Sequence, residues 1–218
     1  MAGLFFPAAL GCALCGGDVP GGAWPICGGC LDSLIEAAPR LHVLEVLGRP
    51  LPVRAVSVYD GRARSAVHLL KYGGRRDLAG PLGELVAALV AAEAPGPGVV
   101  VPVPLHAARR RRRGYNQAGL LASVVARRLG CPDLPHALAR VHATGPQAGS
   151  GASSRRLNVI GAFAAPRPDL VARRRVLLVD DVLTTGATAV ACAAALFRAG
   201  AAAVDVAAFA AAGVTTKK

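Results

Sequence analysis

A short stretch near the carboxyl end of the chain combines an acidic pair with a turn rich in hydroxyl groups. Asp180 and Asp181 follow four apolar residues, and Thr184-Thr185-Gly186-Ala187-Thr188 comes shortly after them. Two adjacent carboxylates can accept hydrogen bonds from neighbouring hydroxyls of a sugar. Threonine hydroxyls and the backbone N–H groups at a helix start can bind phosphate, and glycine permits close approach. The spacing predicts a site for a phosphorylated sugar, against the alternative that these side chains only cap a helix.

The surrounding pattern supplies the elements that would hold this site. Residues 176–179 are continuously apolar, which is typical of a strand buried on both faces, and an alanine-rich helical pattern then runs to about residue 199. We expect further strands at 53–59, 99–103 and 203–209 and helices at 63–71, 78–92 and 116–129, with 134–160 irregular. This alternation predicts an α/β fold, a mostly parallel sheet with flanking helices and its site beyond the strand carboxyl ends.

The first 48 residues differ from the rest and predict a separate small module. Two Cys-x-x-Cys pairs occur here, Cys12 with Cys15 and Cys27 with Cys30. Four thiolates at this spacing fit a tetrahedral zinc site, and the metal would supply folding energy that so small a segment lacks. A disulfide pair or a redox dithiol is the alternative. We therefore expect a four-cysteine zinc module over residues 1–48 and the α/β domain over 49–218. Cys131 and Cys192 are interpreted as small buried hydrophobes.

The charge distribution favours anionic partners. The net charge is +12, and eleven arginines but only one acid, Asp133, lie between Glu93 and Asp169. Such a field attracts pyrophosphate, nucleotides or nucleic acid. Five of these arginines, at 109–113, follow the strand expected at 99–103, and Arg109 and Arg113 are the candidates for bidentate pairing with pyrophosphate. The alternative is a solvated surface or one that faces nucleic acid.

No segment predicts a membrane span. The most apolar region, 187–213, is interrupted by Arg198, Gly200 and Asp205, and so predicts a helix, a turn and a strand. The apolar amino terminus lacks the basic residues that begin a signal peptide. We expect a cytoplasmic protein.

The run from Val176 to Thr188 resembles the 5-phosphoribosyl-1-pyrophosphate (PRPP) signature of type I phosphoribosyltransferases. In that family the acidic pair holds the ribose hydroxyls and the following turn holds the 5-phosphate. The resemblance implies that Asp180 and Asp181 act in catalysis and that the following residues bind PRPP: Asp180, Asp181, Val182, Leu183, Thr184, Thr185, Gly186, Ala187 and Thr188.

Further motifs, in order along the chain, resemble the ComF family. They are the paired cysteines, Leu-Lys-Tyr-Gly-Gly at 70–74, Pro-Val-Pro at 102–104 and Arg-Gly-Tyr-Asn-Gln-Ala at 113–118. The resemblance implies a zinc-ribbon-like module joined to a phosphoribosyltransferase domain, in proteins linked to natural competence and DNA uptake. It also implies residues that bind pyrophosphate or belong to a loop closing over the substrate: Lys71, Arg109, Arg113, Gly114, Tyr115, Asn116, Gln117, Arg140, Gln147 and Arg156.

These resemblances imply an enzyme that uses Mg²⁺ and PRPP to transfer a phosphoribosyl group, with Zn²⁺ as a structural ion. The sequence identifies neither the acceptor nor a general base. The alternative function is non-catalytic: the fold would sense PRPP or act as a scaffold, while the basic face binds single-stranded DNA. The partners would then include single-stranded DNA or competence helicase-type proteins.

Overall fold

A five-stranded, mostly parallel sheet forms the centre of the chain. The computed structural model describes residues 11–19, 25–35, 42–91, 96–141 and 161–212. In spatial order the strands are β1 (His42–Val46), β2 (Arg49–Val58), β7 (Ala203–Ala211), β6 (Arg175–Leu183) and β3 (Val99–Pro102). Only β1 is antiparallel to its neighbour, and β2, β7, β6 and β3 all run in one direction. The carboxyl ends of these four strands therefore meet at one edge of the sheet.

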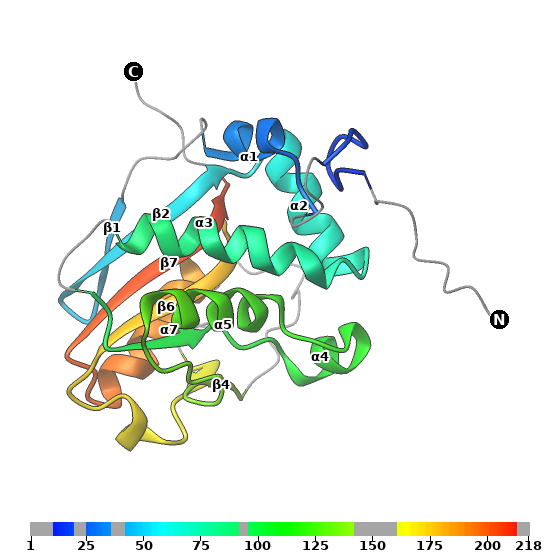
Figure 1. Cartoon of the computed structure of the whole chain (residues 1–218). Coiled ribbons are helices and arrows are strands. Elements are labelled where there is room, and N and C mark those ends of the chain that lie inside the picture. The colour runs from blue at the N-terminus through cyan, green and yellow to red at the C-terminus, as the bar shows by residue number, and fades with distance from the viewer. Residues whose placement is uncertain (1–10, 20–24, 36–41, 92–95, 142–160, 213–218) are drawn as a thin grey trace.

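Helices cover both faces of this sheet. One face packs against α2 (Gly61–Tyr72), α3 (Ala79–Ala91) and α5 (Gln117–Leu129), and the other packs against α7 (Ala187–Arg198). Figure 1 shows α3 and α5 in front of the strands and α7 behind them. The smaller elements are α1 (Gly28–Ile35), α4 (Ala107–Arg113), the paired strands β4 (Ala139–Arg140) and β5 (Phe163–Ala164), and 3-10 turns at Arg76–Leu78 and Pro168–Leu170. The predicted α/β class is confirmed.

Two hydrophobic clusters, one on each face, explain why β6 is continuously apolar. Leu177 and Val179 belong to the cluster with α2, α3 and α5, whereas Val176 and Leu178 belong to the cluster with α7. Successive side chains of a strand point to opposite faces, so a strand covered on both sides needs apolar residues throughout. This alternation also decides where the two acids that follow can point.

Three elements differ from the sequence prediction. β1 was not predicted; it pairs with β2 across a two-residue turn in which Leu47 and Gly48 both have positive φ, as hairpin turns of this length require. The sheet thus begins at His42, inside the range assigned to the small module, and the boundary at 48 stays a prediction. The arginine run at 109–113, where no helix was predicted, lies in the short helix α4. β6 extends to Leu183, so the acidic pair lies within a strand.

The amino-terminal module packs against α2. Cys12, Ile26, Cys30 and Leu34 are buried in the same hydrophobic cluster as the apolar face of α2. α1 contacts both α2 and β2. The module therefore shares a core with the sheet. Within the described ranges, no helix is long and apolar enough to cross a membrane.

Candidate functional site

The acidic pair lies at the carboxyl end of β6, beyond its neighbour β3. The backbone N–H of Val103 donates to the carbonyl of Val179 at 2.9 Å, and Asp180 and Asp181 follow directly. Both side chains are buried. Because adjacent residues of a strand face opposite ways, Asp180 turns toward α7 and Asp181 toward α2. Each carboxylate therefore has its own set of neighbours.

Asp181 is paired with the end of α2. Its Oδ2 atom lies 2.9 Å from Nζ of Lys71, with side-chain exposures of 5% and 19%. Oδ2 accepts no hydrogen bond of standard geometry among the described residues, although the ammonium is within ion-pair distance. The ion pair therefore compensates the charge of the buried carboxylate.

Asp180 is also buried, on the side of β6 that faces α7. Burial, and secondly the negative charge of Asp181, raise the pKa of Asp180 well above its ordinary value. Its Oδ1 atom accepts a hydrogen bond from the backbone N–H of Asp181 at 2.8 Å. Cys192 of α7 is buried nearby, and burial followed by the charge of Asp180 raises the pKa of that thiol. Burial and mutual repulsion thus perturb the ionisation of the acidic pair at the sheet edge, and perturbed pKa values often occur at functional sites.

The threonine-rich turn joins β6 to α7 and is shaped by glycine. Gly186 precedes the helix with φ of 73°, in the left-handed region. A Cβ added there would lie 2.8 Å from Cδ1 of Leu44 on β1, so the end of that leucine side chain would have to shift and the backbone strain would remain. Thr184 and Thr185 are exposed, and α7 begins at Ala187. The first backbone N–H groups of α7 therefore point toward a small open turn that can accept phosphate.

Hydrogen bonds from their own side chains fix the arginine-rich helix α4 and the residues that follow it. His106 caps α4 by accepting from the N–H of Ala108 at 3.2 Å, and Gly114 ends the helix in the left-handed conformation. Asn116 donates from Nδ2 to the carbonyl of Val103 at 3.0 Å. Arg113 donates to Oε1 of Gln117, and the hydroxyl of Tyr115 donates to the carbonyl of Leu70. These bonds attach the start of α5 to β3 and α2.

Of the remaining predicted residues, two arginines lie within the described part of the chain and two residues lie outside it. Arg109 is exposed on α4, and burial followed by the positive charge of Arg109 lowers the pKa of Arg140 on β4. Arg140 in turn acts electrostatically on Cys192, so it lies on the side of the sheet where Asp180 points. Gln147 and Arg156 lie outside the described residues. The structure thus brings Lys71, Asp180, Asp181 and Arg140 to one sheet edge.

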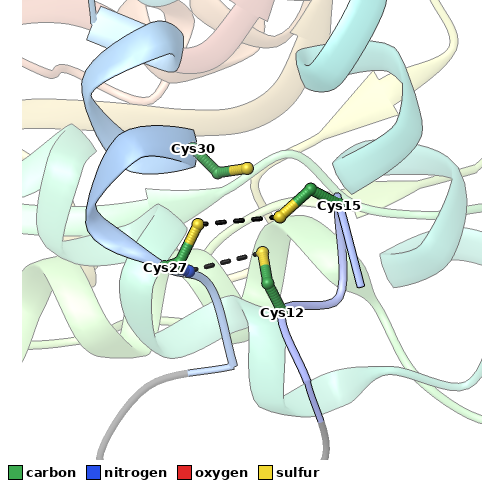
Figure 2. A group of neighbouring side chains, drawn as sticks. All are labelled: Cys12, Cys15, Cys27 and Cys30. Atoms are coloured by element: carbon green, nitrogen blue, oxygen red, sulfur yellow. Dashed lines mark hydrogen bonds between the residues drawn. The ribbon is translucent and has the colours of Figure 1, made fainter. Parts of the chain in front are cut away.

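The four amino-terminal cysteines form a cluster (Figure 2). Their Sγ atoms all lie within 4.8 Å of one another, and Sγ of Cys15 is 3.7 Å from Sγ of Cys27. Zn–S bonds of about 2.3 Å in a tetrahedron require sulfur atoms about 3.8 Å apart. This set of donors therefore fits a structural zinc ion, which all four thiolates would hold.

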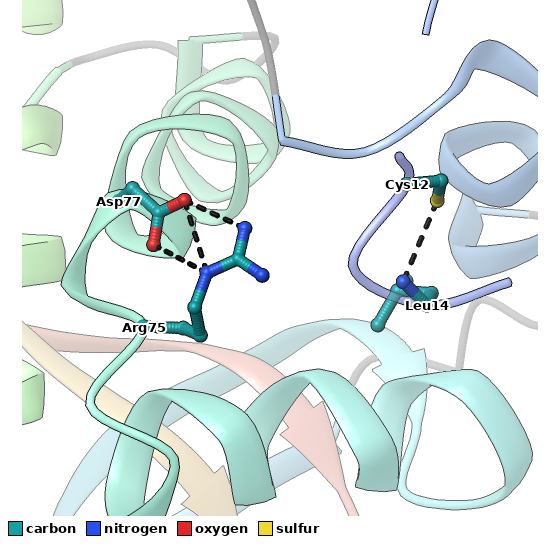
Figure 3. Close-up of polar contacts among 4 residues, drawn as sticks. All are labelled: Cys12, Leu14, Arg75 and Asp77. Atoms are coloured by element: carbon teal, nitrogen blue, oxygen red, sulfur yellow. Dashed lines mark hydrogen bonds and ion pairs between the residues drawn. The ribbon is translucent and has the colours of Figure 1, made fainter. Parts of the chain in front are cut away.

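Backbone donors orient one of these sulfurs. The N–H groups of Leu14 and Cys27 point at Sγ of Cys12 at 3.4 and 3.3 Å. Burial alone would raise the pKa of Cys12, but these and neighbouring donors lower it to about 6, whereas burial and the other thiols raise the pKa of Cys30 to about 12. Figure 3 shows the Cys12–Leu14 contact together with the Arg75–Asp77 pair, whose Nη2 and Oδ2 atoms are 2.8 Å apart. The backbone N–H groups of Leu14 and Cys27 thus favour a thiolate at Cys12.

Two neighbours of the site were not predicted from the sequence. Leu44 lies against the Gly186 turn, and the alternating residues at 42–46 could have indicated its strand. Cys192 lies close enough to Asp180 for the carboxylate to influence the thiol, and no feature of its alanine-rich helix indicates this. Leu44 and Cys192 are too distant in sequence from Gly186 and Asp180 for a local sequence pattern to reveal that they are neighbours.

Comparisons with known proteins agree with this geometry. Residues 115–218 match the family model described as phosphoribosyl transferase domain. The chain is 34% identical over 215 residues to the DNA utilization protein YhgH of Salmonella typhimurium, covering 89% of this chain and 94% of that protein. It is 46% identical over 93 residues to competence protein F of Haemophilus influenzae, covering 42% of this chain and 41% of that one.

Among solved structures, the chain aligns with adenine phosphoribosyltransferase from Leishmania donovani. That structure shares 15% sequence identity with a TM-score of 0.43, covering 87% of this chain and 86% of the other. Family membership is shown instead by the YhgH relative, which is covered over nearly its full length, by the domain match and by the order of the motifs. The chain belongs to the ComF family of phosphoribosyltransferase-like proteins.

Proposed function

We propose that this chain is a phosphoribosyltransferase that binds PRPP together with Mg²⁺ at the carboxyl end of β6. The observation that carries the proposal is the continuous arrangement of Asp180, Asp181, the turn at 184–186 and the start of α7. A buried acidic pair and an open phosphate-sized turn lie a few residues apart on one sheet edge. This arrangement suits a ligand that has vicinal hydroxyls beside a phosphate group.

Each group has a defined role in the proposed complex. The turn and the first N–H groups of α7 bind the 5-phosphate, and the carboxylates of Asp180 and Asp181 accept hydrogen bonds from the ribose hydroxyls. Lys71 and the arginines of α4 and β4 face the pyrophosphate. Mg²⁺ takes carboxylate, phosphate and water oxygens, so the residues present fit it, and when bound it would neutralise charge on the pyrophosphate.

The proposed reaction is a substitution at C1 of the ribose. The bond between C1 and the pyrophosphate oxygen breaks, that oxygen keeps the electron pair, and a bond forms from C1 to a nucleophilic atom of the acceptor. The acceptor loses one proton, so the products are the phosphoribosyl acceptor, pyrophosphate and a proton. Cationic side chains stabilise the leaving group, and the negative charge of Asp181 stabilises positive charge developing at the ribose.

The proposed biological setting is supported by the names of the relatives. Because their names refer to DNA utilization and competence, we place the activity in the uptake or use of external DNA. A cytoplasmic location fits the four free thiols that are proposed to share a zinc ion. The test is DNA uptake in a host that lacks the gene and carries either the wild-type chain or the double variant Asp180→Asn, Asp181→Asn.

Isothermal titration calorimetry tests the binding site. PRPP is titrated with MgCl₂ into the wild-type chain, the double variant Asp180→Asn, Asp181→Asn, and the control Asp205→Asn. Asp205 is also a buried acid of the sheet, but it is paired with Arg54 and Arg175 at 3.6 and 3.1 Å. We expect binding by the wild type and the control and none by the double variant. Absence of wild-type binding would refute the proposal.

Release of pyrophosphate then tests catalysis. A coupled assay with PRPP, Mg²⁺ and candidate acceptors should show release that requires an acceptor and is absent from the double variant. Binding of PRPP without release for any acceptor class would favour the second candidate function, a nucleic-acid-binding protein that senses PRPP. The exposed arginines at 109–112 are the observation that favours this candidate.

A further inference from the structure

The end of α2, which carries Lys71, is held by a residue outside that helix. The last carbonyls of a helix have no partner within it, and the backbone N–H of Gly73 satisfies that of Leu69 at 2.9 Å. Among the described residues, no backbone N–H donates to the next carbonyl, that of the fully buried Leu70. This carbonyl accepts a hydrogen bond from the hydroxyl of Tyr115, 45 positions away in the sequence. The tyrosine therefore caps the turn that carries Lys71.

The ring of Tyr115 is fixed at a second point. The guanidinium carbon of Arg76 lies 4.4 Å from the ring centroid, which is the geometry of a cation–π contact. Arg76 begins the 3-10 turn that follows α2 at a short distance in the sequence. The hydroxyl and the ring of this half-buried tyrosine therefore both contact the segment in which α2 ends.

The residue after Tyr115 attaches the same loop to the strands beside the acidic pair. Nδ2 of Asn116 donates to the carbonyl of Val103 at 3.0 Å, and the N–H of Val103 donates to the carbonyl of Val179 at 2.9 Å. Val179 directly precedes Asp180 in β6. Hydrogen bonds from positions 115 and 116 thus connect the end of α2 with the end of β6. These are the two elements that the lysine–aspartate ion pair also joins.

We propose that Tyr115 is a positioning residue, which places the ammonium group of Lys71 against Asp181 by holding the last turn of α2. A tyrosine hydroxyl has one proton to donate, and this one donates it to the carbonyl of Leu70. The oxygens of a pyrophosphate group act as acceptors, so the hydroxyl has no donor left for them. Tyr115 therefore acts on the ligand through Lys71 and not by direct contact. Its effect on PRPP rests on the proposed function.

Calorimetric titration of the full-length chain with PRPP and MgCl₂ tests the proposal. Tyr115→Phe removes the hydroxyl and keeps the ring over which Arg76 lies. We expect the Kd of PRPP to rise about fivefold, which corresponds to the loss of one neutral hydrogen bond. Tyr59→Phe is the matched control, because Tyr59 is a half-buried tyrosine whose side chain packs against the hydrophobic cluster of α2 and takes no part in these contacts. It should leave the Kd unchanged.

A double-mutant cycle with Lys71→Met separates positioning from direct contact. In that background Tyr115→Phe should cause no further loss of PRPP affinity, because its effect passes through the ammonium group that is already missing. Direct contact of the hydroxyl with pyrophosphate would make the two losses add. Ribose 5-phosphate, which has no pyrophosphate, gives a second comparison: Tyr115→Phe should weaken its binding as well, because Asp181 is proposed to face the ribose.

Hydrogen exchange without ligand tests the hold on α2 separately. Amides of residues 69–74 should exchange faster in Tyr115→Phe than in the wild type or Tyr59→Phe, while thermal melting verifies that every variant is folded. Unchanged exchange, an unchanged Kd of PRPP in folded Tyr115→Phe, or additive losses in the cycle would each overturn the positioning role. Absence of wild-type PRPP binding would refute the proposed function, and hydrogen exchange then decides the hold of Tyr115 on α2 by itself.

Discussion

The ammonium group of Lys71 lies 2.9 Å from Oδ2 of Asp181 and joins the end of α2 to the end of β6. The two residues are 110 positions apart in the sequence, and the contact places a cation directly beside the acidic pair. The charge of Lys71 also opposes the rise in the pKa of Asp180. A single lysine thus stabilises the negative charge of the whole acidic pair.

Lys71→Met should destabilise the fold and weaken PRPP binding. Removing one partner of a largely buried pair leaves the other charge uncompensated, and we expect a loss of about 1–3 kcal/mol in the free energy of unfolding, measured by urea titration. The matched control is Arg75→Met, which breaks an ion pair with Asp77 whose side chains are 29% and 49% exposed. That change should cost less than about 1 kcal/mol. Equal effects of the two substitutions would contradict the special role of Lys71.

Asp180→Asn should raise stability at neutral pH while it weakens PRPP binding. The pKa of Asp180 is higher in the folded than in the unfolded chain, so the protonated form favours folding. Stability is therefore lost as the pH rises above the unfolded pKa of about 3.9 toward the folded value. Asparagine avoids this loss. We expect the variant to melt about 2–4 °C higher per kcal/mol gained at pH 8, with the gain shrinking toward pH 4. A gain independent of pH would contradict this explanation.

Gly186→Ala should be more damaging than an alanine at another glycine with similar backbone geometry. Gly130 has φ of 66° and open space around its missing side chain, whereas Gly186 combines φ of 73° with the contact to Leu44. Left-handed backbone costs alanine about 1–2 kcal/mol at both positions, and the shift forced on the Leu44 side chain adds a smaller cost only at Gly186. Thermal melts compare the two. Leu44→Ala should recover part of the excess in the double variant, and failure to do so would exclude that shift as its cause.

Chelation of zinc should unfold the amino-terminal module and destabilise the chain. We expect one zinc ion per chain by elemental analysis, its loss in Cys27→Ser, and a lowered melting temperature in that variant. Cys131→Ser is the control, because that half-buried thiol lies outside the cluster and should leave the zinc content unchanged. Purified wild-type chain that takes up no zinc after reduction would contradict the assignment.

The sequence predicted those parts of the fold in which local pattern determines structure. The apolar run before Asp180 and the Thr184–Thr188 turn predict β6, the turn and α7, because burial on both faces and helix initiation leave local signatures. β1 was missed because a five-residue edge strand has a weak alternation and lay within the range assigned to the cysteine module. Leu44 is therefore a site neighbour that only tertiary structure reveals.

The site residues show the same division. The residue types of Asp180, Asp181 and Gly186 account for the predicted chemistry. Their roles in PRPP binding stay predictions. Lys71 and Tyr72, part of the Leu-Lys-Tyr-Gly-Gly motif, acquire their importance from packing: Lys71 contacts Asp181, and Tyr72 contacts Arg113. The sequence had only one aromatic residue beside the arginine run, Tyr115, so the contact between Tyr72 and Arg113 could not be predicted without the fold.

The shared core of the cysteine module and α2 has a consequence for how this protein can be divided. Ile26 and Leu34 are buried in the same cluster as Val67 and Leu70 of α2, whereas the family model begins only at residue 115. A truncated chain beginning at β1 would expose the apolar surface that the module covers and would tend to aggregate. The smallest segment that folds is therefore larger than the segment that the family model matches, so exchanging modules between relatives requires matching α2 as well.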